Sequence, residues 1–157
     1  MESYKNPISL FKQTNFSKTI WWKLKVNISG YQNETEDKLV TEIFKNRIFR
    51  LIYPNIYQNN HKFSRILVQL YEDGYICWIN LDGLIIEKYE LNKTESLKNE
   101  HFLIKDKITS ILKWIKDQAE LTNEYLWGGT LGPNFDCSGL IQTAFLKHRI
   151  HIPRDSY

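Results

Sequence analysis

Cysteine is scarce in this chain, and long apolar runs are absent. Only Cys77 and Cys137 occur among the 157 residues, one in a strand-like pattern and one after a glycine-rich loop, so no disulfide framework is expected. No stretch approaches the roughly 20 apolar residues that cross a bilayer. Polar residues interrupt the first 20 positions, which excludes a signal-peptide core there. These absences favour a cytoplasmic protein with free thiols.

An excess of one charge is also missing. The chain has 21 basic and 18 acidic residues, a formal net charge of +3, and its lysines are scattered. We therefore expect no nucleic acid as a partner, and the lack of an apolar span predicts no membrane partner. Aromatic residues make up 14%, and we attribute them to the core of a small β-rich domain rather than to stacking platforms. No metal and no cofactor are expected.

Short apolar segments broken by turns fill residues 19–91, after an N-terminal extension over residues 1–18. Their Ile, Val, Trp and Tyr content favours strands. Asp73-Gly74 and Asp82-Gly83 stand where tight hairpins need positive φ. Five short strands in this space predict a small barrel; they are expected at residues 19–26, 47–53, 65–71, 75–81 and 84–89.

Helical periodicity replaces the strand pattern after a polar linker over residues 92–99. Apolar residues recur at three- and four-residue steps from Ile104 to Ala119, which predicts an amphipathic helix. A second helix is predicted to begin at Cys137 with Asp136 as its N-cap. It should end near residues 147–148, before Pro153, and its expected buried residues are Leu140, Ile141, Ala144 and Phe145.

The segment before the second helix indicates chemistry. It reads Tyr125-Leu126-Trp127-Gly128-Gly129-Thr130-Leu131-Gly132-Pro133-Asn134-Phe135-Asp136. Glycines let a backbone turn tightly and approach a ligand closely, which a core cysteine does not require. A helix N-terminus favours the reactive thiolate, and its N–H groups can stabilise an oxyanion. We therefore interpret Cys137 as a nucleophile.

A base for this nucleophile is harder to find. A thiol normally needs a histidine within hydrogen-bond distance. His148 lies 11 residues after Cys137, and a continuous helix at ~1.5 Å per residue would carry it roughly 16 Å away. His151 follows the same helix end, while His61 and His101 have nothing in their surroundings that recommends them.

Three segments of the C-terminal part resemble a known family. Tyr125-Leu126-Trp127-Gly128-Gly129, Phe135-Asp136-Cys137-Ser138-Gly139-Leu140 and Ile152-Pro153-Arg154-Asp155-Ser156 resemble the start of NlpC/P60 cysteine peptidases, which are papain-like cell-wall hydrolases. Residues 68–79 resemble the bacterial SH3-type domain that precedes the catalytic domain in γ-D-glutamyl-L-diamino acid endopeptidases. The resemblance implies an α+β protein with an SH3-like barrel at residues 19–91 and a partial catalytic domain at residues 100–157.

The resemblance also implies an activity. Its substrate would be the bond between γ-D-glutamate and a diamino acid in peptidoglycan stem peptides or muropeptides, cleaved through a thioester intermediate. Cys137 matches the family nucleophile, and Tyr125 matches the motif tyrosine near the oxyanion site. Asp136 and Ser138 match residues that line the substrate-binding side.

The SH3-type domain is implied to enclose the free amino end of the stem peptide. By position its contribution would be Tyr75, with Glu72 or Asp73, because carboxylates attract an ammonium group. A plain turn role is the alternative for the two carboxylates.

The chain departs from the family after residues 153–156. The catalytic histidine and its polar partner come from downstream strands in NlpC/P60 domains, and only twenty residues follow Cys137 here. We therefore expect a C-terminally truncated catalytic domain that is inactive as it stands, whether naturally short or a piece of a longer protein. The alternatives are a non-catalytic module that binds cell-wall peptide and a decayed, unstable product.

Overall fold

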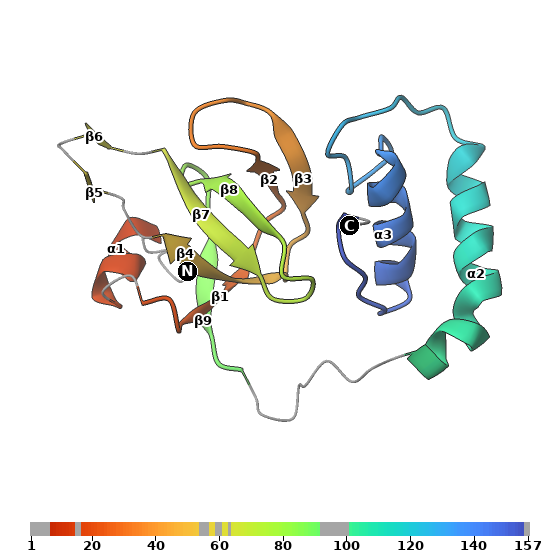
Figure 1. The fold of residues 1–157 in the computed structure, drawn as a ribbon, viewed down its shortest axis with the longest axis horizontal. Helices are drawn as coiled ribbons and strands as arrows, with labels where there is room; N and C mark the ends of the chain where they lie inside the picture. The colour runs from red at the N-terminus through yellow and green to blue at the C-terminus, as the bar shows by residue number, and fades with distance from the viewer. Residues whose placement is uncertain are drawn as a thin grey trace, which may run out of the picture. The chain divides into compact units, whose positions relative to one another are not determined.

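The computed structural model describes residues 7–14, 17–53, 57–58, 61–62, 64–91 and 101–155. The chain divides into two compact units, Met1–Leu91 and Asn92–Tyr157. The first is built mainly of strands and the second of helices (Figure 1), so the protein is of the α+β class. The expected linker at residues 92–99 lies outside the described residues.

A seven-stranded antiparallel sheet forms the first unit. Its hydrogen-bonded order is β3-β2-β8-β7-β4-β1-β9, and β5 pairs with β6 in a separate ladder. The elements are α1 (Pro7–Gln13), β1 (Trp21–Leu24), β2 (Ile28–Tyr31), β3 (Leu39–Ile43), β4 (Ile48–Tyr53), β5 (Tyr57–Gln58), β6 (His61–Lys62), β7 (Arg65–Leu70), β8 (Ile76–Asn80) and β9 (Ile86–Tyr89).

The closed barrel expected from the sequence is not confirmed, because this sheet is open. Its edges are β3 and β9, and no ladder joins them in the part of the chain that the structure describes. Strands β1 and β2 follow one another in the chain but do not pair with each other. Residues 25–27 lead away from β1, which pairs with β4 and β9, to β2, which pairs with β3 and β8.

The five predicted strands correspond to β1, β4, β7, β8 and β9, whereas β2, β3 and the two-residue strands β5 and β6 were missed. Gly30 breaks the apolar pattern of β2, and glycine weakens a strand prediction. Its role is visible only in the packed sheet. A Cβ at Gly30 would lie 2.8 Å from both Cys77 Sγ and Thr41 Cγ2, so the neighbouring strands β8 and β3 pack over the space that a side chain would fill.

The core of the first unit follows the two-residue period of its strands. Ile66, Val68 and Leu70 of β7 are buried, and Trp22 of β1 is also buried. Helix α1, which lies in the predicted N-terminal extension, adds Phe11 with its ring edge-on to Trp22 at 5.1 Å between centroids. The residues that form this core are Phe11, Trp22, Leu24, Ile43, Phe49, Leu51, Ile66, Val68, Leu70, Cys77, Ile79, Leu81, Leu84 and Ile86.

The hairpin glycines have the predicted conformation. Gly74 and Gly83 have φ of +70° and +74°, in the left-handed region that glycine occupies without a steric cost. The two Asp-Gly sequences therefore mark turns on either side of β8, as the sequence predicted.

Two helices, α2 (His101–Ala119) and α3 (Cys137–Lys147), form the second unit and confirm the helical predictions. Ile111 of α2 packs with Ala144 of α3 and with Ile150. None of the helices in the described residues is both long and apolar enough to cross a membrane.

The buried face of α3 differs from the prediction. Ile141, expected inside, is 40% exposed, whereas Gln142 and Thr143 are buried. The Thr143 hydroxyl donates to the Thr130 carbonyl at 2.7 Å, and Gln142 Nε2 donates to the Ile152 carbonyl at 3.2 Å. Hydrogen bonds to main-chain carbonyls let these polar side chains enter the core.

Candidate active site around Cys137

A loop that is closed by main-chain hydrogen bonds precedes α3. The N–H of Leu126 donates to the Phe135 carbonyl at 3.2 Å, and the N–H of Gly129 donates to the Leu126 carbonyl at 2.9 Å. Gly128 and Gly132 have φ of +80° and +77°, which L-residues rarely adopt. The glycines of this loop therefore serve the backbone geometry that places Cys137.

Asp136 is the N-cap of α3, as predicted. Its Oδ1 accepts hydrogen bonds from the Gly139 N–H at 2.6 Å and from the Ser138 hydroxyl at 3.2 Å. Its Oδ2 accepts from the Gly128 N–H at 2.8 Å and forms an ion pair with Arg154 Nη2 at 2.5 Å. One carboxylate thus joins the glycine loop, the first turn of α3 and the segment after the helix.

The surroundings of Asp136 favour its ionised form. Burial by itself would raise the pKa of this carboxyl, but the hydrogen bond from Arg154, those from the Gly139 and Gly128 N–H groups, and the Arg154 charge lower its pKa below the ordinary value. The side chains of Arg154 and Asp136 are only 2% and 9% exposed. They form a buried ion pair at the residue that precedes Cys137.

Cys137 itself is exposed and is the first residue of α3. Tyr125 forms a parallel bridge with Phe135 and is 65% exposed. The second unit therefore brings Tyr125, Asp136, Cys137 and Ser138 together on one loop and helix start. An accessible thiol at a helix N-terminus is suited to nucleophilic attack on a carbonyl carbon.

Of the histidines with described side chains, His148 lies at the other end of α3, and His151 lies in the segment that returns along the helix, where the Ile152 carbonyl accepts from Gln142 Nε2. His148 is the C-cap of the helix, and its Nδ1 lies 2.8 Å from the Ala144 carbonyl oxygen. His151 follows it. The side chains of His61 and His101 lie outside the described part of the structure. Among the described residues no group of three His, Cys, Asp or Glu side chains could hold a metal ion.

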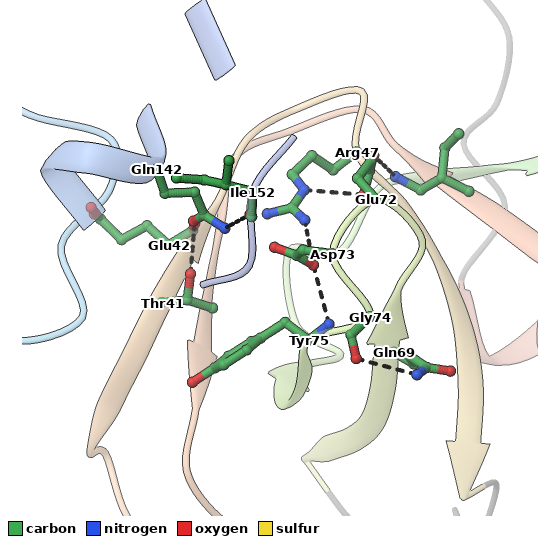
Figure 2. A network of polar contacts seen from close by, with 11 residues as sticks. Thr41, Glu42, Arg47, Gln69, Glu72, Asp73, Gly74, Tyr75, Gln142 and Ile152 are labelled. Carbon is green, nitrogen blue, oxygen red and sulfur yellow. Dashed lines mark hydrogen bonds and ion pairs between the residues drawn. The ribbon is translucent and has the colours of Figure 1, made fainter. Parts of the chain in front are cut away.

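The first unit carries the other predicted site residues, and Figure 2 shows their surroundings. Arg47 Nε donates to Glu72 Oε2 at 3.2 Å, and Arg47 Nη2 lies 2.8 Å from Asp73 Oδ1. Glu72 Oε1 accepts from the Ile48 N–H at 3.0 Å, and Asp73 Oδ1 accepts from the Tyr75 N–H at 3.1 Å. Both carboxylates therefore already face a cation, and binding of a substrate ammonium group by them stays a prediction.

Arg47 stays charged in this network. Burial by itself would lower the pKa of its guanidinium, but Asp73 and Glu72 outweigh that effect, so the pKa is raised above its usual value. Burial raises the pKa of the nearby Cys77 thiol to about 12, with Arg47 lowering it and Asp73 raising it further. Cys77 is thus a protonated core thiol, whereas Cys137 is exposed.

Sequence reasoning missed the two arginines that hold these carboxylates. Arg154 lies 18 residues after Asp136 and Arg47 lies 25 residues before Glu72, so no local pattern links the partners. The available signal was chemical. A carboxylate at a helix start behind a glycine loop needs a cation once it is buried, and Arg154 was already part of the matched motif.

The glycine loop packs closely on α3 at Gly139. A Cβ there would lie 2.0 Å from the Gly129 carbonyl oxygen and 3.0 Å from Asp136 Oδ1. Helix propensity alone predicts that Gly139→Ala gains up to about 1 kcal/mol. We expect instead a loss of about 1–3 kcal/mol in the second unit, because the backbone must shift. Urea unfolding followed through the α3 amide signals measures this, with exposed Lys105→Ala as control; a stabilised Gly139→Ala would contradict the packing.

The loop, the cap and the exposed thiol lie in the segment that matches a known family. Residues 122–157 match the model of the NlpC/P60 family. Over 32 residues the chain is 56% identical to a gamma-D-glutamyl-L-lysine dipeptidyl-peptidase of Bacillus cereus, which covers 20% of this chain and 10% of that protein. The matched segment thus spans about a tenth of the curated relative.

A solved structure was also found to be similar. NlpC2 from Trichomonas vaginalis aligns with a TM-score of 0.33 at 18% identity, over 86% of this chain and 43% of that chain.

Proposed function

We propose that this chain supplies the nucleophile-bearing part of an NlpC/P60-type cysteine peptidase that acts on peptidoglycan stem peptides. The observation that carries the proposal is an exposed Cys137 at the capped start of α3, inside the segment that matches the family. The bond attacked would join γ-D-glutamate to a diamino acid. The name of the Bacillus cereus relative supports this substrate class.

The chemistry follows from the thiol. The Cys137 thiolate attacks the γ-carbonyl carbon, and the N–H groups at the start of α3 face the negative charge that forms on the carbonyl oxygen. Collapse of the tetrahedral intermediate breaks the C–N bond, leaves a thioester on Cys137 and releases the diamino acid amine, which takes up a proton. Water then hydrolyses the thioester and restores the thiol.

Proton transfer is the step that the described residues do not supply. His148 caps the end of α3 opposite Cys137, and no hydrogen bond described in the structure joins His151 to Cys137. We therefore propose that the 157 residues by themselves bind the peptide and can form a covalent adduct, but turn over substrate slowly. The expected ammonium contact of Tyr75, Glu72 and Asp73 is not required for this proposal.

An affinity label tests the proposal without needing turnover. L-Ala-γ-D-Glu with a chloromethyl ketone in place of the scissile amide should alkylate Cys137 about tenfold faster than the α-linked L-Glu isomer, equivalent to roughly 1.4 kcal/mol of recognition. Peptide mapping by mass spectrometry locates the adduct. Cys137→Ser is the matched control, and buried Cys77 should stay unmodified.

Two outcomes would contradict this function. Equal labelling by the two isomers would mean that the site does not recognise γ-D-glutamate. Saturable binding of L-Ala-γ-D-Glu-diaminopimelate without selective labelling of Cys137 would point instead to a non-catalytic peptide-binding module.

A further inference from the structure

Arg154 contacts the two residues that flank Cys137 in the sequence. Its Nη2 pairs with Asp136 Oδ2 at 2.5 Å, and its Nη1 donates to Ser138 Oγ. Ser138 Oγ in turn donates to Asp136 Oδ1 at 3.2 Å. The buried guanidinium therefore contacts the residue before Cys137 and the residue after it, while Cys137 itself is exposed.

The Arg154 side chain is buried at these contacts. Its side chain is 2% exposed, and its Nε has no hydrogen-bond partner among the described residues. A buried donor without a partner is unfavourable. The described contacts of the guanidinium are those that its Nη2 and Nη1 make to Asp136 and Ser138.

The chemistry of the contact requires arginine. Two nitrogens of one planar group reach two different acceptors, and a lysine ammonium, which is a compact point charge, cannot reproduce that fixed spacing. Asp136 also receives the N–H groups of Gly128 and Gly139. Loss of Arg154 would leave this carboxylate buried without its cation and free Ser138 from one of its two contacts.

We propose that Arg154 is a positioning residue for Cys137. It holds the Asp136 cap and the Ser138 hydroxyl in place, and so fixes the first turn of α3 from which the thiol is presented. The idea deepens the proposed function, since it assumes that Cys137 is the nucleophile, but thiol reactivity can be measured whether or not the chain is a peptidase.

The test compares Arg154→Lys, Ser138→Ala and the exposed control Arg149→Lys. Iodoacetamide alkylation of Cys137 at pH 7 is followed by mass spectrometry, and urea unfolding of each variant is followed through the amide signals of α3. We expect alkylation to fall about two- to fivefold in Arg154→Lys and Ser138→Ala, the size of a helix N-terminal contribution. Arg149→Lys should match the original protein.

A merely structural role would lower stability without changing the alkylation rate of the folded protein. Ser138→Ala keeps the ion pair, so it should fold even if Arg154→Lys does not. Unchanged alkylation in folded Ser138→Ala would overturn the proposal, as would full retention of the rate by Arg154→Lys. Slower alkylation together with no preference for the γ-D-glutamyl label would support the positioning role while rejecting the peptidase.

Discussion

Arg47→Met should destabilise the first unit by about 3–5 kcal/mol, the usual cost of removing one partner from a buried charge network. Arg47 pairs with Glu72 and Asp73, whose side chains are only 10% and 2% exposed. Without the guanidinium both carboxylates would be buried as uncompensated charges. The measurement is urea unfolding followed through the amide signals of β4 and β7.

Two further variants separate the charge network from the loss of packing. The triple variant Arg47→Met, Glu72→Gln and Asp73→Asn should recover part of the loss, because no buried charge remains. Lys25→Met removes an exposed ion pair, in which the side chains of Lys25 and Glu87 are 39% and 47% exposed. This variant should lower the free energy of unfolding by less than about 1 kcal/mol. If Arg47→Met is no more harmful than Lys25→Met, the network does not hold the β7–β8 hairpin in place.

The same network bears on the predicted role of Glu72 and Asp73. The resemblance to an SH3-type domain implied that these carboxylates contact an ammonium group, and a plain turn role was the alternative. In the structure Arg47 supplies that positive charge, and the Ile48 and Tyr75 N–H groups supply further donors. The partners are distant in sequence but adjacent in the sheet, which is why a reading of the turn alone could not find them.

Local signals predicted the fold well where local energetics decide it. The Asp-Gly hairpins, the period of α2 and the Asp136 cap depend on residues within a few positions of one another. Gly30 in β2 depends instead on Cys77 and Thr41 in the neighbouring strands. The order of strands in the open sheet likewise depends on which strands pair. The sequence patterns of the individual strands do not specify that pairing.

At the candidate site the exposed cysteine at the capped start of α3 was predictable, and the residues that support it were not. The glycines, the N-cap residue and the cysteine lie in one short segment, so their geometry could be predicted from local sequence. The buried face of α3 could not be predicted in this way, since Ile141 is exposed while Thr143 is buried against the Thr130 carbonyl. Tertiary hydrogen bonds there override the hydrophobic pattern of a single helix.

Asp136→Ala should cost the second unit about 3–5 kcal/mol, because Arg154 would stay buried without its counter-ion. The variant also removes the acceptor of the Gly128 and Gly139 N–H groups. Adding Arg154→Met should return part of the loss by removing the stranded charge. Urea unfolding followed through the α3 amides measures both variants, and the exposed Lys113–Asp117 pair of α2 supplies the control Asp117→Ala, expected within about 1 kcal/mol of the original protein.

The lowered pKa of Asp136 predicts how the stability of the second unit depends on pH. The pKa of Asp136 is lower in the folded state than its ordinary value, so the unfolded state binds the proton first. The stabilisation from Asp136 is therefore fully present above the unfolded pKa of about 3.9 and is lost as pH falls through the lower folded pKa. The second unit of the original protein should lose stability across that interval, and the double variant Asp136→Ala/Arg154→Met should lose less. An equal acid dependence in both proteins would mean that the Asp136–Arg154 pair contributes nothing to the stability of the helix start that carries Cys137.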